Sequence, residues 1–206
     1  MPSRLTLQLP VLLSVLAFSA GAQALSFDFG SDAQGWTTSN GGAQVWLAEG
    51  GNSGGFLQIS DVSDDDFLLN APAGALGNWS AYHGGTLYFD ARNSNGDSPD
   101  WQPFGEVTLS GPGGSVLLDI APANQPVADG QWHRYSASLS DAAWGPSLGT
   151  VLANVTSFTI KGEFHAGVTE VVGIDNIAVT ASAVPEPTVL YLLSVGLLVL
   201  TLGRRP

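Results

Sequence analysis

Short runs of alternating apolar and polar residues constrain the fold of this 206-residue chain more than any other feature. In the run Thr86–Ala91, Leu87, Phe89 and Ala91 fall on one face. A period of two residues is typical of a β-strand with one buried face, and the clusters of Gly, Asn, Asp and Pro between such runs indicate turns. Similar runs occupy residues 106–110, 115–120, 133–139, 156–160 and 173–180, and residues 147–154 suit one or two helical turns.

The spacing of these runs predicts the architecture. Residues 25–183 contain no long pattern with the 3.6-residue period of an α-helix, no internal repeat and no dividing linker. About seven to ten short strands in a segment of this length are typical of a β-sandwich. We therefore expect one all-β domain over residues 25–183.

Cysteine is absent, and acidic residues far outnumber basic ones. Residues 25–183 contain 17 acidic residues against three basic ones, Arg92, Arg134 and Lys161. Such a surface repels nucleic acid and anionic lipid, so neither is expected as a partner. It does offer many oxygen ligands for a hard cation. Without disulfides, core packing must stabilise the fold, with or without a metal ion.

The N-terminal residues 1–24 read as a secretory signal peptide. Arg4 supplies a positive charge, Leu9–Phe18 is mostly apolar, and Ala22-Gln23-Ala24 has the small-residue pattern of a cleavage site. The alternative is an uncleaved anchor. Cleavage after Ala24 predicts a mature chain that begins near Leu25 and lies outside the cytoplasm.

The C-terminal residues 184–206 have three parts. Val184–Pro187 is an extended break, because proline lacks a backbone N–H and disfavours helix in the residue before it. Thr188–Leu202 is a 15-residue apolar run without charge, and Arg204 and Arg205 follow it. As a helix the run spans about 22 Å, short of the roughly 30 Å hydrocarbon core. Because it is apolar on every face and ends at arginines, we expect a short membrane helix at residues 188–202.

These three parts resemble the PEP-CTERM sorting signal of Gram-negative bacteria that make exopolysaccharide. The matching residues are Pro185, Glu186 and Pro187, then the apolar run, then Arg204 and Arg205. The resemblance implies sorting by an exosortase, a membrane cysteine protease, with transient anchoring in the inner membrane. An ordinary C-terminal anchor is the alternative. The expected destination is the cell envelope or the extracellular space.

A series of short motifs runs through residues 25–183 in a fixed order. They are Asp32–Trp36, Ala71–Gly77, Tyr82–Phe89, Trp132–Tyr135, Val151–Thr156 and Gly173–Ile177. This order resembles the laminin B (domain IV) module. The resemblance implies a galactose-binding-like jelly-roll sandwich related to carbohydrate-binding modules. The cysteine-rich EGF-like repeats of laminins are missing, so laminin assembly is not expected.

No residue is predicted to be catalytic. The three histidines, His83, His133 and His165, are isolated in sequence, and no metalloprotease, nucleophile-elbow, phosphate-binding or dinucleotide motif is present. Carboxylate pairs suit glycoside hydrolysis, but with 17 acids in the body some pair is always available. The chain is therefore predicted not to be an enzyme, and a polysaccharide-acting enzyme remains the alternative.

Six tryptophans stand out in so acidic a chain. Tryptophan rings stack on sugars, but core packing explains most tryptophans because they bury a large apolar area. Trp36 and Trp132 match core positions of the laminin B pattern. Trp79 and Trp101 have polar neighbours and are predicted to be exposed platforms for a glycan.

Two other acidic segments are interpreted as surface loops. Asp64–Asp66 is a solvated turn. Asn93–Asp97 begins like a calcium loop, but Phe104 stands where an EF-hand needs a bidentate glutamate, so that interpretation fails.

A structural calcium ion (Ca²⁺) is a further hypothesis. Related jelly-roll modules hold calcium between an acid of the first strand and an aspartate of the last, with main-chain carbonyls from a loop. The corresponding residues here are Asp28, Asp175 and the glycine-rich segment Glu49–Gly55. The alternative is that both carboxylates lie at strand edges in water.

Together these features predict an exported, non-catalytic, glycan-binding β-sandwich of an exopolysaccharide matrix. A purely structural matrix protein without a specific ligand is a third possibility.

Overall fold

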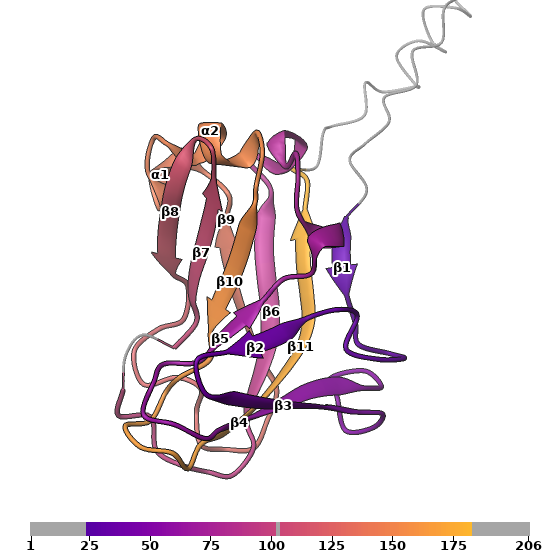
Figure 1. Cartoon of the computed structure of the whole chain (residues 1–206), viewed down its shortest axis with the longest axis vertical. Helices are drawn as coiled ribbons and strands as arrows, with labels where there is room; N and C mark the ends of the chain where they lie inside the picture. Colours follow the sequence, from indigo (N-terminus) through magenta and orange to yellow (C-terminus); the bar gives the residue numbers. More distant parts are fainter. Residues whose placement is uncertain (1–23, 102–103, 183–206) are drawn as a thin grey trace, which may run out of the picture.

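The computed structural model describes residues 24–101 and 104–182 (Figure 1). Residues 1–23, with Ala22 of the predicted cleavage site, lie outside this part. The predicted sorting residues also lie outside it, namely Pro185, Glu186, Pro187, Arg204 and Arg205. Among the described residues, no helix is both long and apolar enough to cross a membrane.

Two antiparallel sheets form a sandwich, as the alternating sequence pattern predicts. The first sheet has the order β3-β4-β11-β6-β9, with β1 paired to one part of β11. Its strands are β1 (Leu25–Phe27), β3 (Gly42–Leu47), β4 (Phe56–Asp61), β6 (Thr86–Asn93), β9 (His133–Ser138) and β11 (Val171–Thr180).

The second sheet has the order β2-β5-β10-β7-β8. Its strands are β2 (Thr37–Ser39), β5 (Leu68–Asn70), β7 (Glu106–Gly111), β8 (Gly114–Asp119) and β10 (Ser157–Lys161). The described residues thus contain eleven strands, more than the sequence predicts, because three-residue strands such as β2 and β5 are too short to show a period.

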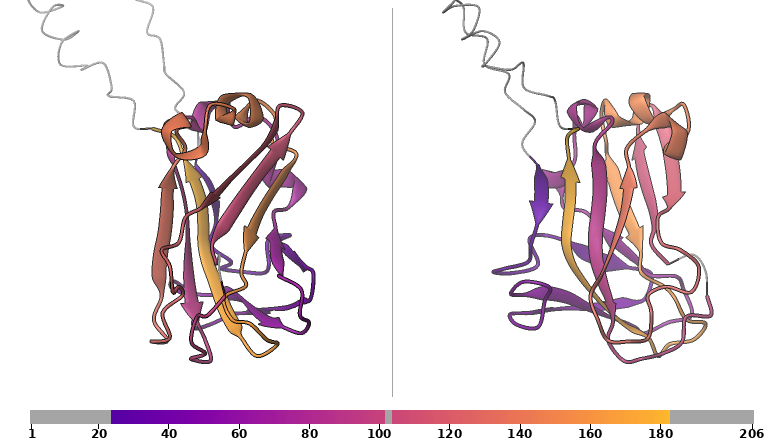
Figure 2. Two further views of the ribbon diagram at one scale, coloured as in Figure 1. Left: turned by 90° about the vertical axis from the view of Figure 1, so that its left-hand side faces the viewer. Right: turned by 180° about the vertical axis from the view of Figure 1, so that it is seen from behind.

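Short helices and long loops occupy opposite ends of the sandwich. The helices α1 (Asp141–Trp144) and α2 (Leu148–Leu152) lie at one end, with the 3-10 turn η2 (Ser80–Tyr82) (Figures 1 and 2). A second 3-10 turn, η1, spans Ala73–Ala75. The long connections after β6 and β10 lie at the other end.

The core lies between the sheets and follows the alternating pattern. Leu87, Phe89 and Ala91 of β6 are fully buried, as are alternate residues of β7 and β10. Trp36 is buried among them, with its ring edge-on to Phe158 at 5.3 Å between centroids. Burial of this apolar area is the main stabilising contribution in a chain without disulfides.

A β-bulge interrupts β11. Asp175 pairs with Asp90 and Ala178 pairs with Tyr88, so the bulge places one extra residue on β11. Asn176 within it has a φ of 48°, in the left-handed region that asparagine tolerates. The bulge lies between the part of β11 that pairs with β4 and the part that pairs with β1.

The first strand ends earlier than predicted. Asp28 is expected within the first strand, but β1 ends at Phe27, and Phe29 has a φ of 48°. Phe29 is buried in the core, whereas Asp28 is exposed. Asp28 therefore follows the first strand and does not lie within it.

Candidate functional site

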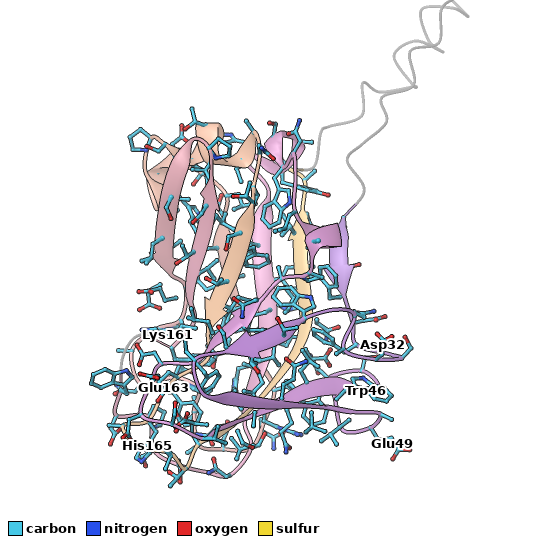
Figure 3. The ribbon with its side chains drawn as sticks, viewed as in Figure 1. Asp32, Trp46, Glu49, Lys161, Glu163 and His165 are labelled. Carbon is cyan, nitrogen blue, oxygen red and sulfur yellow. The ribbon has the colours of Figure 1, made fainter. Side chains whose placement is uncertain are left out.

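A groove lies at the loop end of the sandwich and has a volume of about 300 Å³. Three connections line it, those between β4 and β5, between β6 and β7, and between β10 and β11. The lining residues are Asp64, Asp66, Trp101, Glu163, Ala166 and Gly167. Figure 3 shows Glu163 between Lys161 and His165, away from Asp32, Trp46 and Glu49.

Trp101 is an exposed aromatic ring held in a fixed position. Its side chain is 44% exposed, and its indole Nε1 donates a hydrogen bond of 2.8 Å to Asp66 Oδ1. The second oxygen of Asp66 accepts a hydrogen bond from the Lys161 ammonium. The backbone N–H of Trp101 donates to the Phe164 carbonyl at 3.0 Å. The ring therefore projects into the groove without needing a ligand to order it.

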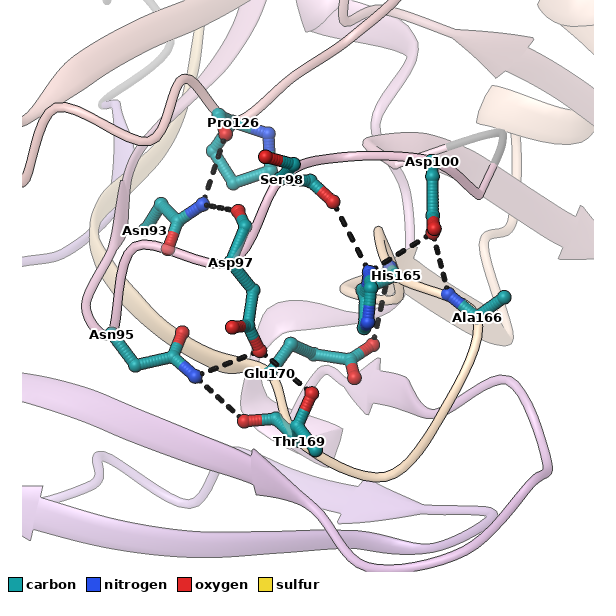
Figure 4. Close-up of polar contacts among 10 residues, drawn as sticks. All are labelled: Asn93, Asn95, Asp97, Ser98, Asp100, Pro126, His165, Ala166, Thr169 and Glu170. Atoms are coloured by element: carbon teal, nitrogen blue, oxygen red, sulfur yellow. Dashed lines mark hydrogen bonds and ion pairs between the residues drawn. The ribbon is translucent and has the colours of Figure 1, made fainter.

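Hydrogen bonds join the loops behind the groove (Figure 4). Asp97 Oδ2 accepts from Asn95 Nδ2 at 2.9 Å and from Thr169 Oγ1 at 2.7 Å. The bond from Thr169 is the main reason that the pKa of Asp97 is lowered. The segment Asn93–Asp97 is thus a hydrogen-bonded turn that connects two loops.

A second set of contacts ties the loop after β10 to the segment before Trp101. His165 Nδ1 lies 3.0 Å from Asp100 Oδ1 and 3.1 Å from the Ser98 carbonyl (Figure 4). The backbone N–H of Ala166 donates to Asp100 Oδ1 at 2.8 Å. Because Ala166 lines the groove, these contacts fix one of its walls relative to Trp101.

The expectation that Trp79 is an exposed platform is wrong. Trp79 is only 2% exposed, and its Nε1 donates to the Ala75 carbonyl at 2.8 Å. Its ring packs edge-on against Phe158 at 5.4 Å between centroids. The two 3-10 turns on either side of Asn78 turn the indole inward, which its polar neighbours in sequence do not reveal.

Trp132 also differs from its expected core position. It is half-buried, with its ring 5.4 Å from that of Phe56, and its Nε1 donates to the Gly50 carbonyl at 3.2 Å. The Arg92 guanidinium lies over both rings, at 4.8 Å from the centroid of Trp132 and 4.9 Å from that of Phe56. The Arg92 guanidinium thus covers part of the ring face of Trp132.

An ion pair between a buried aspartate and a half-exposed arginine lies near these rings, on a face of β6 that the sequence did not single out. Asp90 is fully buried and accepts from Arg134 Nε at 2.7 Å and from Nη2 at 3.0 Å. Asn52 Nδ2 and Asn176 Nδ2 also donate to it, at 2.7 and 2.9 Å. Burial alone raises the pKa of Asp90, but these donors together hold it below its usual value. The Arg134 guanidinium covers the Tyr88 ring at 4.2 Å.

The residues of the predicted calcium site are only partly brought together. The Glu49–Gly55 loop does reach Asp175, and a Cβ on Gly51 would lie 2.8 Å from Asp175 Oδ2. The loop presents a donor, however: the Asn52 N–H lies 2.7 Å from that oxygen, and the Asn176 N–H is 2.7 Å from Oδ1. Burial raises the pKa of Asp175.

Asp28 is exposed and has other partners. Its Oδ1 accepts from the Gly30 N–H at 3.1 Å and from Gln34 Nε2 at 3.0 Å. Backbone N–H groups already donate to both oxygens of Asp175. A calcium ion would need oxygen ligands at the positions that these N–H groups occupy. Calcium at Asp28 and Asp175 stays a prediction, and the donor arrangement does not favour it.

A second cluster of acids lies beside the groove. Asp61, Glu163 and Glu170 are 5%, 4% and 0% exposed, and one carboxylate oxygen of each lies within 4.8 Å of the others. Burial, together with the neighbouring Glu170 and Asp61, raises the pKa of Glu163 to about 9. The sequence does not reveal this cluster, because Asp61 is about a hundred residues from Glu163 and Glu170 and no local motif relates them.

The three histidines each lie beside an aspartate at the surface. His83 Nε2 is 3.0 Å from Asp141, and His133 Nε2 is 2.9 Å from Asp129. Both histidines are partly exposed, and neither lies on a connection that lines the groove. Their arrangement is that of surface pairs, as the sequence indicates.

The fold defines a class of protein, the jelly-roll β-sandwich. Its solved examples include the L4b domain of human laminin alpha-2, with a TM-score of 0.55 and 12% identity over 77% of this chain and 98% of that domain. A family 30 carbohydrate-binding module gives a TM-score of 0.53 and 14% identity over 82% and 95%. The solution structure of CtCBM11 gives 0.51 and 14% over 81% and 100%.

The family model for laminin B (domain IV) matches residues 68–191, more than half of the chain. The chain therefore belongs to the laminin B (domain IV) family, and the resemblance seen in the sequence motifs is confirmed. A search of curated proteins found no match. At these identities the solved structures establish the fold alone.

Proposed function

We propose that this protein is an exported, non-catalytic, glycan-binding module of an extracellular polysaccharide matrix, and that the groove at Trp101 is its binding surface. The observation that carries the proposal is the Trp101 ring, which is 44% exposed yet held by Asp66 in a groove. Similar solved structures described as carbohydrate-binding modules support the proposal.

The other tryptophans are less suited to stack on a sugar. Trp101 is the one tryptophan of the six that is exposed. Trp36, Trp79 and Trp144 are buried in the core, and the guanidinium of Arg92 lies over the ring of Trp132. A sugar ring that stacks on Trp101 would meet a ring face over which none of the described arginine or lysine side chains lies.

The groove also restricts the chemistry of the ligand. Asp64 and Asp66 line it, and carboxylate oxygens, those of Asp64 above all, can accept hydrogen bonds from sugar hydroxyls. The body as a whole is strongly acidic, so a polyanionic glycan would be repelled. We therefore expect a neutral polysaccharide in preference to one rich in uronic acid or sulfate.

Delivery to the matrix belongs to the same proposal. Residues 1–24 would direct export across the inner membrane, and residues 184–206 would anchor the chain there until an exosortase acts near Pro185–Pro187. The support for this step is the sequence pattern alone, because these residues lie outside the described part of the chain.

A glycan array probed with the purified full-length chain tests the binding function. Trp101→Ala should reduce binding to the best neutral glycan, and Trp101→Phe should keep part of it because a ring remains. Base stacking on aromatic rings is worth about 1–3 kcal/mol, and the same scale is expected for a sugar. Leu117→Ala is the control, since Leu117 is a 53% exposed apolar residue of β8 that does not line the groove.

The same preparations, assayed for release of reducing sugar, separate the alternatives. Binding without release supports the proposal, and release would make the protein a polysaccharide-acting enzyme. Neither binding nor release would leave a structural matrix protein. Equal binding by wild type and Trp101→Ala would remove the groove as the binding surface.

A further inference from the structure

The buried cluster of Asp61, Glu163 and Glu170 joins the two sheets at the loop end of the sandwich. Asp61 is the last residue of β4, and Glu170 immediately precedes β11 in the same sheet. Glu163 follows β10 of the other sheet. The Asp61 N–H donates to the Glu170 carbonyl at 3.1 Å, which fixes two of the three residues side by side.

Each carboxylate of the cluster has one buried oxygen without a hydrogen-bond partner among the described residues. These oxygens are Asp61 Oδ2, Glu163 Oε2 and Glu170 Oε2. Other oxygens are satisfied: Asp61 Oδ1 accepts from the Ser63 N–H at 3.2 Å, and Glu170 Oε1 from the His165 N–H at 3.4 Å. Buried polar groups are nearly always hydrogen-bonded, so three such oxygens in one place require either a proton shared between Glu163 and Glu170 or a bound cation.

No arginine or lysine side chain in residues 24–101 and 104–182 is available as a partner for these oxygens. This part of the chain contains Arg92, Arg134 and Lys161. Lys161 pairs with Asp66, Arg134 pairs with Asp90, and Arg92 donates to the Gly50 carbonyl and lies over two aromatic rings. Ionising all three acids without a counter-charge would cost several kcal/mol for each buried charge.

We propose that Asp61, Glu163 and Glu170 bind a divalent cation of the hard, oxygen-preferring kind, and that this ion is calcium. The site goes beyond the glycan-binding function, because it stands whether or not the groove binds a sugar. It is also distinct from the predicted site at Asp28 and Asp175, where backbone donors occupy the carboxylate.

The ligand set selects the ion. The three carboxylates provide three unpartnered oxygen atoms and no nitrogen or sulfur, which suits calcium or magnesium better than zinc, and water can supply the other oxygen ligands. Calcium accepts irregular coordination by 6–8 oxygens at roughly 2.3–2.6 Å, and carboxylates bind it in either a monodentate or a bidentate manner. A site assembled from the end of β4 and the connection between β10 and β11 matches that tolerance.

The groove gives the ion a route to the cluster. Glu163 lines the groove at its inner side while remaining 4% exposed, so the cluster lies just beneath the groove surface. Gly162 allows this course of the chain, because a Cβ there would collide with the Phe67 ring. The ion would link the loop after β10, which contains Ala166 and Gly167 of the groove wall, to the end of β4.

Thermal unfolding of the full-length chain in EDTA and in millimolar calcium chloride tests the proposal. We expect calcium to raise the melting temperature of the wild type by several degrees, because an ion that binds only the folded state stabilises it. Glu163→Gln and Glu170→Gln should abolish most of that rise. Asp175→Asn, which changes a buried acid outside the cluster, should keep it.

A second readout separates loss of the ion from simple misfolding. In EDTA, Glu163→Gln should melt within a few degrees of the wild type, because the amide keeps the shape of a carboxyl that its pKa of about 9 leaves uncharged at neutral pH. Isothermal titration with calcium should show one site in the wild type and none in Glu163→Gln. An absent calcium shift in the wild type, or an equal shift in Glu163→Gln, would overturn the proposal. A shift lost only in Asp175→Asn would do so too and would place the ion at Asp175.

Discussion

The Trp101 indole and the Asp66 carboxylate meet across 35 positions of the sequence in a hydrogen bond of 2.8 Å. Asp66 also pairs with Lys161, so one carboxylate connects an exposed ring to the end of β10. An exposed tryptophan on a loop normally samples several rotamers, and ordering it on binding costs free energy. The contact with Asp66 lowers that cost before any ligand arrives.

The first prediction concerns Asp66 as a positioning residue. Asp66→Ala removes the acceptor of the Trp101 indole, and a net hydrogen bond is worth about 1 kcal/mol. Affinity for the best neutral glycan should therefore fall by about fivefold in a binding titration.

The matched control for this change is Asp66→Asn. Its side-chain oxygen still accepts from Trp101 Nε1, while the ion pair with Lys161 is lost, so binding should stay close to wild type. If Asp66→Ala binds as well as wild type, the ring does not depend on Asp66 for its position.

The second prediction separates the two tryptophans that the sequence pattern groups together. Trp79→Ala removes a ring that is 2% exposed and should lower the free energy of unfolding by about 3–5 kcal/mol. Trp101→Ala removes a ring that is 44% exposed and should lower it by about 1 kcal/mol or less. Urea denaturation of the full-length chain measures both. A small effect of Trp79→Ala would show that the ring contributes little to the core.

The strands from β6 onward could be predicted from the sequence within about two residues. Residues 86–91, 106–110 and 133–139 correspond to β6 (Thr86–Asn93), β7 (Glu106–Gly111) and β9 (His133–Ser138). Their alternation is regular because one face of each strand meets the core while the other meets solvent or polar groups. The three-residue strands have no room for a repeat, and only pairing with neighbours defines them.

The candidate site was much less predictable. Trp101 is correctly expected to be exposed, but nothing local shows that Asp66 would hold it. Asp61, Glu163 and Glu170 meet because β4 pairs with β11 and because the loop after β10 returns across the sandwich. Such long-range contacts leave no periodic pattern in the sequence. The cluster of acids is therefore visible only in the folded structure.

The third prediction concerns sorting and uses the native host. If an exosortase processes the tail, the intact mass of the matrix or envelope form should lack Thr188–Leu202 and the two terminal arginines. Changing both Pro185 and Pro187 to alanine should leave the C-terminal tail in the measured mass, because the extended segment that the exosortase recognises is lost. Pro112→Ala, a proline in the body, is the control and should be processed normally. A wild-type mass that includes Arg204 and Arg205 would mean an uncut anchor.

The fourth prediction concerns acid and the Asp90–Arg134 pair. The folded protein holds the pKa of Asp90 below its unfolded value of 3.8, since Arg134, Asn52 and Asn176 donate to the carboxylate and outweigh its burial. Folding therefore favours the ionised form, and the stabilisation is fully present above the unfolded pKa. It is lost as the pH falls through the folded pKa, because the protonated carboxyl no longer pairs with Arg134.

The variant Arg134→Gln isolates this contribution from the other acids of the chain. At pH 7 it should melt well below the wild type, because Asp90 stays buried beside Asp175 without its cation. As the pH falls from about 4 towards 2, the difference between the two melting temperatures should shrink. The reason is that Asp90 of the wild type becomes protonated and no longer gains from its pairing with Arg134. Differential scanning calorimetry across this range measures it. A difference that stays constant with pH would mean that Arg134 stabilises the fold through its contact with the Tyr88 ring and not through Asp90.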